Sequence, residues 1–500
     1  MMTLQQASGW IKPAQLVGFD SADVQIKRVH TDTRTLAVGD LFIALKGEKY
    51  DANDFLTEAA QRGAVAAVAH HGLAAAGLPG LEVANSRLAL GQLATGWRAQ
   101  FDLPLIAVTG SNGKTTVTQM IASILRAWKQ GDALSTEGNL NNEIGVPMTL
   151  LRLRRSHQVA VVELGMNHPG EIAYLAGLAK PSIALVNNAQ REHLEFMATV
   201  EAVALENGSV IASLDAGGTA VFPADDDYTP AWRKLSGTRT VLTFAAPGSS
   251  EPGSSVDADV TASARWSGDG WQVVAATPSG PLEFSLHIAG RHNVKNALAA
   301  TACALAAGVP LLCIASGLSA FVPVKGRSRA MLIPVQGQSL SLIDDTYNAN
   351  PDSMRAAIDV LAELPGPRLL VMGDMGEVGD QGPELHEEAG RYARERGIEN
   401  LFALGQQSER AVSSFERGQH FENIEALNAA VLDQLGQLGS VLVKGSRFMQ
   451  MERVVQAITG FLGSEPKFAE PTARPPGAVL RTAAKLVPDP NNPKEAPHVA

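Results

Sequence analysis

The sequence predicts an α/β protein of three successive units, with parallel β-sheets in the second and third. Three observations support this fold class. Short apolar runs that read as strands alternate with helical patterns, which is typical of parallel sheets. A strand, a glycine-rich loop and a helix follow one another at residues 105–116. The chain of 500 residues is also too long for one ordinary core, so roughly two to four domains are expected.

Composition and charge narrow the class of protein. Hydrophobic residues make up 45% of the chain and charged residues 18%, as in folded globular proteins. The formal charge of −10 argues against non-specific binding to nucleic acid or to an anionic membrane. The only cysteines, Cys303 and Cys313, lack metal-ligand spacing and read as reduced core residues of a cytoplasmic protein. The first residues show no signal-peptide pattern, which favours the same compartment.

One uncharged stretch, residues 297–324, is long enough to cross a bilayer. However, it is rich in Ala and Gly, and Gly308 and Pro310 interrupt it. Two packed helices of a globular protein explain this stretch better, so we expect no membrane insertion.

The N-terminal unit, residues 1–102, is predicted to form a small α/β domain. Residues 41–45 and 65–69 read as strands, with helical spacing from residue 56 to residue 60 between them. The polar segment 31–34 (TDTR) precedes them. Taken alone, it predicts a solvated turn.

The strongest motif is LIAVTGSNGKTT at residues 105–116. Its apolar strand, glycine loop and following helix build a phosphate site from backbone N–H groups and a helix N-terminus. In that arrangement Lys114 reaches the β- and γ-phosphates of ATP and Thr115 binds Mg²⁺. A strict Walker A motif has glycine where this chain has Val108. A purely structural turn therefore stays open as the alternative.

Two further strand ends of the middle unit, residues 103–325, carry candidate ligands. The apolar run 159–162 ends in Glu163, and the run 183–186 precedes His193. Ligands bind at the carboxyl ends of strands in open α/β sheets, so Glu163 is a candidate ligand for the metal that accompanies ATP. The alternatives are a solvent-facing strand end for Glu163 and a structural or exposed imidazole for His193.

Three other segments complete the middle unit. Residues 135–147 are dense in Asn and Gly, which predicts either an exposed connector or a substrate-contacting loop. Alternating apolar and polar residues between 256 and 288 predict a small antiparallel sheet. The next helix starts with polar residues, among them Asn293 and Asn296, and helix capping is their simplest role.

The C-terminal unit, residues 326–463, predicts a parallel, doubly wound sheet. Its strands are expected within residues 340–343, 369–373, 401–405 and 441–447, and its charged strand ends are Asp344, Asp345, Asp374, Lys444 and Arg447. We expect these charges on one rim, facing a cleft shared with the phosphate-binding unit. No nucleophile has a convincing base partner, so phosphoryl transfer by positioning and charge neutralisation is expected. The Pro-rich tail, 464–500, is expected to be disordered.

The motifs together resemble the Mur ligase family. VTGSNGKTT, TEGNLNNEIGVP, VVELGMNHPGEI, NNAQREHLE, GRHNVKNALAA, DDTYNANPDSM, MGDMGEVG and KGSR occur in the family's order, and TDTRTLAVGDLFIALKGEKYDANDF is similar to its UDP-binding domain. The resemblance spans about residues 25–460. It implies a three-domain architecture with a small N-terminal α/β domain, a central P-loop parallel sheet and a C-terminal Rossmann-like domain.

The implied activity is an ATP-dependent amide ligase of peptidoglycan precursor synthesis. DDTYNANPDSM and MGDMGEVG are similar to the member that joins D-alanyl-D-alanine to UDP-N-acetylmuramoyl-tripeptide. There, ATP phosphorylates the tripeptide carboxylate and the dipeptide amine attacks the acyl phosphate. The implied cofactors are ATP and Mg²⁺, and the implied form is a cytoplasmic monomer.

The resemblance also implies roles for individual residues. Lys114 would neutralise the transferring phosphoryl group, Thr115 and Glu163 would hold Mg²⁺, and His193 would serve a second Mg²⁺. Nucleotide contacts are implied for Thr109, Gly110, Ser111, Asn112, Gly113, Lys114, Thr115, Thr116, Asn293, Asn296, Arg327, Asp345, Asn348 and Asn350. Substrate contacts are implied for Thr33 and Arg34 (UDP), Asn141 and Asn142 (peptide), and Lys444 and Arg447 (dipeptide carboxylate).

One position departs from the family pattern. Many members carry a lysine on the helix after the metal-binding His, modified to a carbamate that supports the second Mg²⁺. The matching residue here is Asn207, and no lysine occurs between Lys180 and Lys234. The second metal is then held differently or more weakly, with Glu206 as a candidate substitute.

Two other functions stay open at this point. One is a sister ligase that adds a different amine, although the DNPR motif of the diamino-acid-adding relative is absent. The other is a nucleotide-binding scaffold without turnover.

Overall fold

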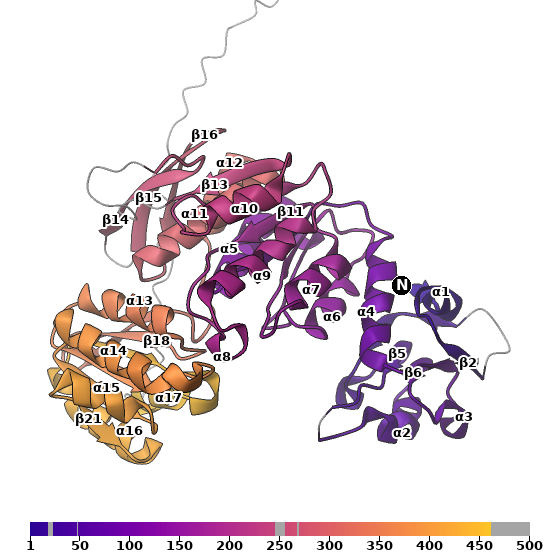
Figure 1. Cartoon of the computed structure of the whole chain (residues 1–500). Helices are drawn as coiled ribbons and strands as arrows, with labels where there is room; N and C mark the ends of the chain where they lie inside the picture. The colour runs from indigo at the N-terminus through magenta and orange to yellow at the C-terminus, as the bar shows by residue number, and fades with distance from the viewer. Residues whose placement is uncertain (19–23, 48, 246–255, 268–269, 462–500) are drawn as a thin grey trace, which may run out of the picture.

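The computed structural model describes residues 1–18, 24–47, 49–245, 256–267 and 270–461. The predicted tail, 464–500, lies outside the described residues. The described part is α/β, and each predicted unit contains its own main sheet, which confirms the expected fold class. Figure 1 shows the middle unit between the other two, with the C-terminal unit in orange and yellow and the N-terminal unit in indigo.

The N-terminal unit holds a five-stranded sheet in the order β2-β7-β6-β5-β4. These strands are β2 (Gln15–Val17), β7 (Gly80–Glu82), β6 (Ala66–Ala69), β5 (Asp40–Ile43) and β4 (Arg28–His30). The two predicted strands are β5 and β6, and every residue of both is buried. A short pair, β1 (Met2–Thr3) and β3 (Gln25–Ile26), stands apart, and the helices are α1 (Leu4–Trp10), α2 (Leu56–Gln61), α3 (Leu73–Ala76) and α4 (Ser86–Arg98).

The middle unit holds a fully parallel sheet in the order β13-β12-β11-β8-β10-β9. Its strands are β13 (Thr240–Phe244), β12 (Thr219–Pro223), β11 (Ile183–Val186), β8 (Leu105–Thr109), β10 (Val159–Glu163) and β9 (Ala133–Ser135). Side chains of β8 alternate between the two faces of the sheet, and all of them are buried. The strand that leads into the phosphate loop therefore lies inside the sheet, with β10 and β11 as neighbours.

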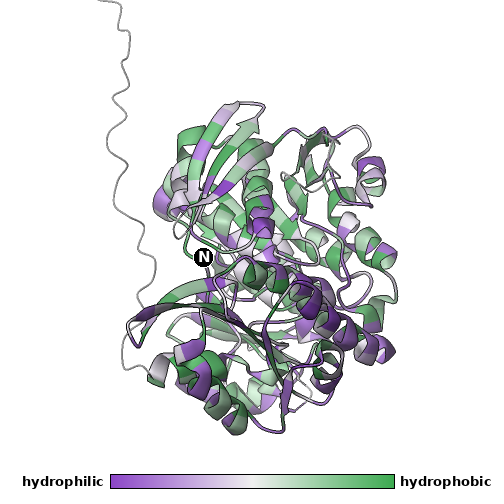
Figure 2. Ribbon diagram, turned by 90° about the vertical axis from the view of Figure 1, so that its left-hand side faces the viewer, coloured by the Kyte–Doolittle hydropathy of each residue, from purple (hydrophilic) through white to green (hydrophobic). Residues whose placement is uncertain are grey.

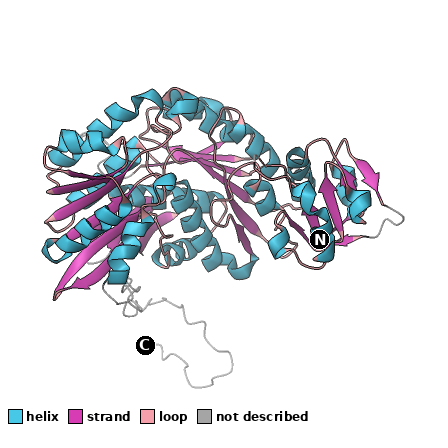
Figure 3. Ribbon diagram, turned by 90° about the horizontal axis from the view of Figure 1, so that it is seen from below, coloured by secondary structure: helices cyan, strands magenta, loops and turns pink. Residues whose placement is uncertain are grey.

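Helices cover both faces of this sheet (Figure 3). One face packs against α5 (Lys114–Lys129), α11 (Arg291–Ala306) and α12 (Leu311–Ser319), and the other against α6 (Gly145–Leu150), α7 (Glu171–Ala179), α9 (Val200–Ala212) and α10 (Thr229–Ser236). Helices α11 and α12 occupy most of the uncharged stretch 297–324. Among the described residues, no helix combines the length and apolar character of a membrane span.

Two predictions for the middle unit are met, one of them in part. The antiparallel sheet expected between residues 256 and 288 is present as β14 (Thr261–Ser267), β15 (Gly270–Thr277) and β16 (Gly280–Leu286). The loop expected at 135–147 is shorter, because α6 already begins at Gly145. The side chain of Asn142 accepts hydrogen bonds from the N–H groups of Ile144 and Gly145, and Pro147 is tolerated in a first helical turn.

The C-terminal unit holds a six-stranded sheet in the order β17-β18-β22-β19-β20-β21. The strands are β17 (Arg329–Val335), β18 (Gln338–Asp345), β22 (Ser440–Lys444), β19 (Arg368–Gly373), β20 (Asn400–Leu404) and β21 (Gln419–Phe421), and the helices are α13 (Pro351–Ala362), α14 (Gly382–Glu395), α15 (Ser408–Phe415), α16 (Ile424–Gln434) and α17 (Glu452–Phe461). All neighbouring strands are parallel except β17 and β18.

The expectation of an all-parallel sheet is therefore wrong at one edge. Gln336 and Gly337 join β17 to β18, and both have positive φ, as in the tight turns of antiparallel hairpins. The sequence analysis also missed β21, α15 and α16. Strand β21 is only three residues long, and its side chains are exposed or half-buried, so it leaves no apolar pattern.

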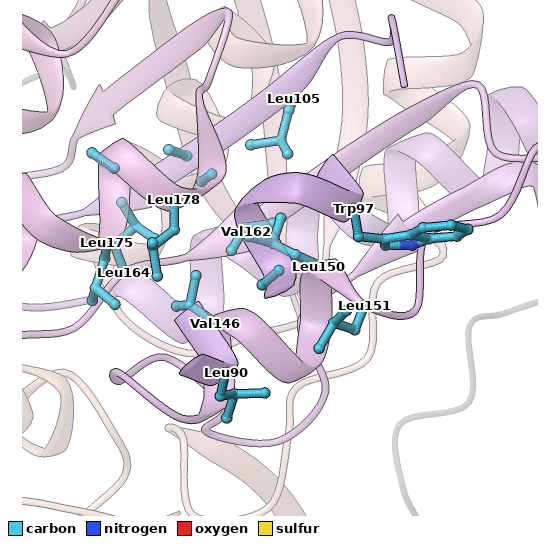
Figure 4. Packing of buried hydrophobic residues seen from close by; sticks show 14 of the residues in the cluster. Leu90, Trp97, Leu105, Val146, Leu150, Leu151, Val162, Leu164, Leu175 and Leu178 are labelled. Atoms are coloured by element: carbon cyan, nitrogen blue, oxygen red, sulfur yellow. The ribbon is translucent and has the colours of Figure 1, made fainter. Parts of the chain in front are cut away.

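The N-terminal and middle units share one hydrophobic core, whereas the C-terminal sheet has separate clusters on its two faces. Figure 4 shows side chains of this shared cluster, among them Leu90 and Trp97 of α4, Leu150 of α6 and Leu175 of α7. Two hydrogen bonds reinforce this joint: Trp97 Nε1 donates to the carbonyl of Leu153 at 3.1 Å, and Arg98 Nε to that of Ala179 at 2.9 Å. In Figure 2, hydrophobic residues run along the strands, while hydrophilic residues gather on the outer helices.

Candidate active site

A cleft of about 1420 Å³ lies between the middle and C-terminal sheets. Its walls come from the loops that follow β8, β10 and β11 and from those that follow β18 and β22. The cleft brings together most of the predicted site residues: Ser111, Asn112, Gly113, Lys114, Thr115, Thr116, Asn141, Asn142, Glu163, His193, Asn293, Asn296, Arg327, Asp345, Asn348, Asn350, Lys444 and Arg447. Thr109, Gly110, Thr33 and Arg34 do not line it.

The loop between β8 and α5 is shaped by two glycines with positive φ. At Gly110 (φ 130°) a Cβ would lie 2.9 Å from the backbone N of Asn187, and at Gly113 (φ 80°) it would lie 2.7 Å from Oδ1 of Asn296. Only glycine fits at either position. Asn188 fixes the loop further, because its side chain accepts from the N–H of Asn112 at 2.8 Å. The N-terminus of α5 points into the cleft, as it does in anion-binding sites. A purely structural turn would not account for this orientation.

Lys114, the first residue of α5, is held by three acceptors. Its ammonium donates to the carbonyls of Gly110 (2.7 Å) and Ser111 (3.0 Å) and to the carboxylate of Glu192 (2.8 Å). Both side chains of the Lys114–Glu192 ion pair are largely buried. Glu192 was not singled out from the sequence.

Glu163 and Thr115 form a group of oxygen atoms that fits a magnesium ion. Thr115 Oγ1 lies 3.1 Å from Oε1 of Glu163, which also accepts from the side-chain amide of Asn141 at 2.7 Å. The other carboxylate oxygen, Oε2, is buried and has no hydrogen-bond partner among the described residues. Carboxylate and hydroxyl oxygens are the ligands that Mg²⁺ prefers. Glu163 is 1% exposed, so the solvent-facing alternative is wrong.

Arg327 brings the C-terminal unit to the same place. Its Nη2 donates to Thr115 Oγ1 at 3.2 Å, and its guanidinium carbon lies 3.8 Å from the ring centre of Tyr347. The preceding residue, Gly326, has φ 77° and its N–H donates to Asp344. A cation from the C-terminal unit therefore reaches the start of α5.

His193 lies between carboxylates of two units. Its Nδ1 is 2.7 Å from Oε2 of Glu377, in the loop after β19, and its Nε2 is 3.4 Å from Oε1 of Glu192. Burial lowers the pKa of His193, but the carboxylates of Glu192 and Glu377 outweigh it and raise the pKa to about 9. The imidazole is therefore neither exposed nor isolated: it lines the cleft and is charged at neutral pH.

We expect Glu377→Gln to lower the pKa of His193 clearly below its value of about 9 in the metal-free protein. Because this pKa lies above the ordinary 6.5, the interaction stabilises the fold fully below pH 6.5 and is lost as pH rises through about 9. NMR titration of the imidazole signals measures both values. His386, whose pKa is lowered by burial and which does not line the cleft, is the internal control. An unchanged His193 titration would contradict the assignment.

Asn207 and Glu206 are engaged elsewhere. Asn207 is fully buried, and its Oδ1 accepts from Thr109 Oγ1 (2.6 Å) and from the N–H of Gly110 (3.0 Å). Thr109 and Gly110 are thus part of the support beneath the phosphate loop. Glu206 accepts from backbone N–H groups at the start of α7, at 2.8 and 2.9 Å, which is a helix-capping arrangement. The suggestion that Glu206 replaces the carbamate finds no support in these contacts.

Asn293 and Asn296 lie in the first turns of α11 but do not cap it. The Asn293 side chain donates to the carbonyl of Ala289 (2.7 Å), and Asn296 donates to Asn293 (2.9 Å). Asn187, next to the phosphate loop, donates to Oδ1 of Asn296 at 2.9 Å. This chain of amides connects α11 to the loop and borders the cleft.

On the C-terminal side, the charged strand ends divide into two groups. Asp345, Lys444 and Arg447 line the cleft. Asp344 and Asp374 lie at the same strand ends, but their side chains hydrogen-bond inside their own unit, so the expectation that all five charges face the cleft is wrong for these two. Lys444 is 3% exposed and pairs with Asp345 at 2.6 Å, so a carboxylate of the same unit neutralises its charge. Arg447 is exposed, and its Nη1 donates to half-buried Glu452 at 2.8 Å.

Thr33 and Arg34 lie in a short 3₁₀ helix of the N-terminal unit. Arg34 pairs with Asp32 at 2.6 Å, and its side chain is largely exposed, which confirms the predicted solvated turn. The N-terminal unit contributes Arg87 to the cleft, where its guanidinium lies 3.1 Å from Glu143 of the middle unit. The sequence analysis did not identify Arg87.

Arg191 clamps the middle unit to the C-terminal unit. Its Nε and Nη2 donate to Asp352 of α13 at 3.0 and 2.6 Å, and its Nη1 to Glu388 of α14 at 2.8 Å. Its backbone N–H also donates to Asp352 at 2.8 Å. Nearby, Asn350 and Asn112 join the units through their side-chain amides at 2.9 Å. Local sequence signals cannot reveal these pairs, because the partners of Arg191 are 161 and 197 residues away.

Comparisons with known proteins agree with this arrangement. Family models match three segments: "Mur ligase family, catalytic domain" at residues 25–98, "Mur ligase middle domain" at 108–304 and "Mur ligase, glutamate ligase domain" at 329–447. The UDP-N-acetylmuramoyl-tripeptide–D-alanyl-D-alanine ligase of Escherichia coli strain K12 is 41% identical over 442 residues, covering 87% of this chain and 94% of the relative. The enzyme of that name from Haemophilus influenzae is 38% identical, with 92% and 98% covered.

Solved structures show the same likeness. A crystal structure of MurF from Acinetobacter baumannii has a TM-score of 0.82 and 36% identity, covering 91% of this chain and 98% of the other. MurF from Thermotoga maritima, solved with ADP, has a TM-score of 0.74 at 24% identity and covers 89% and 99%, which supports the fold alone. With its phosphate loop, its three units and these relatives, the chain belongs to the Mur ligase family.

Proposed function

We propose that this chain is an ATP-dependent ligase that joins D-alanyl-D-alanine to UDP-N-acetylmuramoyl-tripeptide. The observation that carries the proposal is the cleft itself, which places a phosphate loop, a group of magnesium-type ligands and residues of the C-terminal unit around one space. The two ligases named above carry this activity in their names, and the match extends over more than nine-tenths of their length.

The chemistry begins with transfer of the γ-phosphoryl group to the tripeptide carboxylate. The N–H groups of the loop and the N-terminus of α5 would hold the phosphates, and Lys114 would turn from its present acceptors to neutralise the transferring group. Arg327, already at the start of α5, would add a second positive charge from the C-terminal unit. Asn293, Asn296, Asp345, Asn348 and Asn350 would surround the rest of the nucleotide.

Thr115 and Glu163 would hold a magnesium ion that accompanies ATP, and His193 would border a second one. When bound, such ions screen phosphate charge and polarise phosphoryl or acyl oxygens. The unpaired buried oxygen of Glu163 fits this role. The second ion requires His193 to lose its proton, since an imidazolium has no lone pair to offer.

The dipeptide amine would then attack the acyl phosphate and expel phosphate. Arg447 would bind the dipeptide carboxylate, because its guanidinium is exposed at the cleft, whereas Lys444 would support Asp345. Asn141 and Asn142 would border the peptide, and Thr33 and Arg34 the UDP part. We propose a monomer acting in the cytoplasm, with the N-terminal unit as residues 1–102, the middle unit as 103–325 and the C-terminal unit as 326–463.

Phosphate release from ATP tests this function. The full chain is incubated with UDP-N-acetylmuramoyl-tripeptide and one amine: D-alanyl-D-alanine, D-alanine, L-lysine, diaminopimelate or D-glutamate. We expect release and ligated product only with D-alanyl-D-alanine. Release with another amine would indicate a sister ligase, and no release with any amine would indicate a scaffold without turnover.

A further inference from the structure

Glu192 is a buried carboxylate that no role described so far requires. It follows β11 in the segment that also carries His193, and it lines the cleft. Only 8% of its surface is exposed. One oxygen, Oε1, faces Lys114 at 2.8 Å and His193 at 3.4 Å. The other oxygen, Oε2, is buried and has no hydrogen-bond partner among the described residues. A buried carboxylate oxygen without a partner is costly, which points to a missing positive ligand.

The ion pair between Lys114 and Glu192 cannot persist once a nucleotide binds. Lys114 must turn to the phosphates, and Glu192 then loses its cation. Glu163 and Glu377 also border this cleft, and a triphosphate adds further negative charge. Like charges at such short distances repel one another strongly unless a cation lies between them. A divalent cation next to Glu192 would neutralise this carboxylate, as Lys114 does in the nucleotide-free protein.

Glu377 also lies beside His193, but its carboxylate faces Nδ1 (2.7 Å), whereas Glu192 faces Nε2 (3.4 Å). The residues considered above as replacements for the carbamate offer no anionic ligand there. Asn207 is neutral, and its carbonyl oxygen is used by Thr109 and Gly110. Glu206 caps α7. Within the described ranges, no group of three or more His, Cys, Asp or Glu side chains is arranged to hold a metal by itself. The remaining ligands must therefore come from the nucleotide and water, as is usual for Mg²⁺.

We propose that Glu192 exchanges partners when nucleotide binds: it releases Lys114 to the phosphates and, together with His193, becomes a ligand of a second divalent cation. This inference rests on the proposed function, since it assumes that ATP occupies the cleft. It assigns Glu192 the anionic role for which Asn207 is unsuited.

Counting bound Mn²⁺ tests the proposal without relying on activity. Electron paramagnetic resonance of free Mn²⁺ gives the number bound to the full chain in the presence of a non-hydrolysable ATP analogue. We expect a first and a second Mn²⁺ in the wild-type protein and loss of the second, or at least about tenfold weaker binding, in Glu192→Gln. Glu195→Gln is the matched control, because Glu195 lies in the same segment but is exposed and outside the cleft.

A second variant covers the case in which Glu192→Gln fails to fold. Glu192→Asp keeps the charge for Lys114 but shortens the side chain, so we expect weakened binding of the second Mn²⁺ with an unchanged first site. Wild-type binding of a single Mn²⁺, or full second-site affinity in either folded variant, would overturn the proposal. The ligation assay separates the two claims: product formed with only one Mn²⁺ bound leaves the proposed function standing, whereas absence of product refutes that function whatever the count.

Discussion

Replacing Lys114 with alanine is expected to lower kcat for phosphate release by about 10³- to 10⁵-fold, the range seen when a single cation on a transferring phosphoryl group is removed. No other ammonium group is held at the phosphate loop by contacts like those of Lys114 with Gly110 and Ser111 in the described residues. Single-turnover phosphate release with saturating ATP measures the effect on the chemical step.

Two controls separate this effect from damage to the fold. Lys234→Ala removes an exposed lysine of α10 outside the cleft and should leave the rate unchanged. Lys114→Arg keeps a positive partner for Glu192, so the fold should be retained, while the different shape of guanidinium still impairs the reaction. A rate within tenfold of wild type for a folded Lys114→Ala protein would refute the phosphate-site assignment.

Replacing Arg191 with alanine is expected to lower kcat about 100-fold, because a displacement of about 1 Å between reacting groups has that effect. The change removes the side-chain hydrogen bonds to Asp352 and Glu388, which join the middle and C-terminal units. It also frees the segment that carries Glu192 and His193. Small-angle scattering should show a broader distribution of sizes, as the C-terminal unit moves about the turn at Gly326.

Arg355→Ala is the matched control for this prediction. Arg355 also pairs with Glu388, at 3.2 Å, and stacks on Tyr392, but all three residues belong to the C-terminal unit. Its loss should leave kcat and the scattering profile close to wild type. If Arg191→Ala behaved like Arg355→Ala, the contact between the units would be incidental to catalysis.

The sequence predicted best what short segments determine. The phosphate loop directly follows an apolar strand, Glu163 ends one, and His193 lies in the loop after another, so their positions near strand ends could be inferred without knowing the fold around them. The same holds for the order of elements in the middle unit. The carboxyl ends of parallel strands share one edge, which explains why residues inferred separately meet in one cleft.

The contacts between units could not be predicted in the same way. Glu377 and Asp352 lie far along the chain from His193 and Arg191, and the sequence around each residue does not indicate its partner. The partner of Lys444 could not be predicted either. The resemblance implied a role for this cation at the dipeptide carboxylate, but a buried ammonium needs a partner, and Asp345 lies beside it at 2.6 Å.

The packing of α4 between the N-terminal and middle units has a consequence for how the protein unfolds. Leu90 and Trp97 belong to the same hydrophobic cluster as β8 and α7, so in the described residues one apolar cluster continues from the N-terminal unit into the middle unit. The clusters of the C-terminal sheet include only Ala289 from the described part of the middle unit, and ion pairs and amide contacts join the two units. Cooperative unfolding follows shared cores. The three main sheets should therefore unfold in two cooperative steps, and the C-terminal unit should be able to unfold while the phosphate loop remains folded.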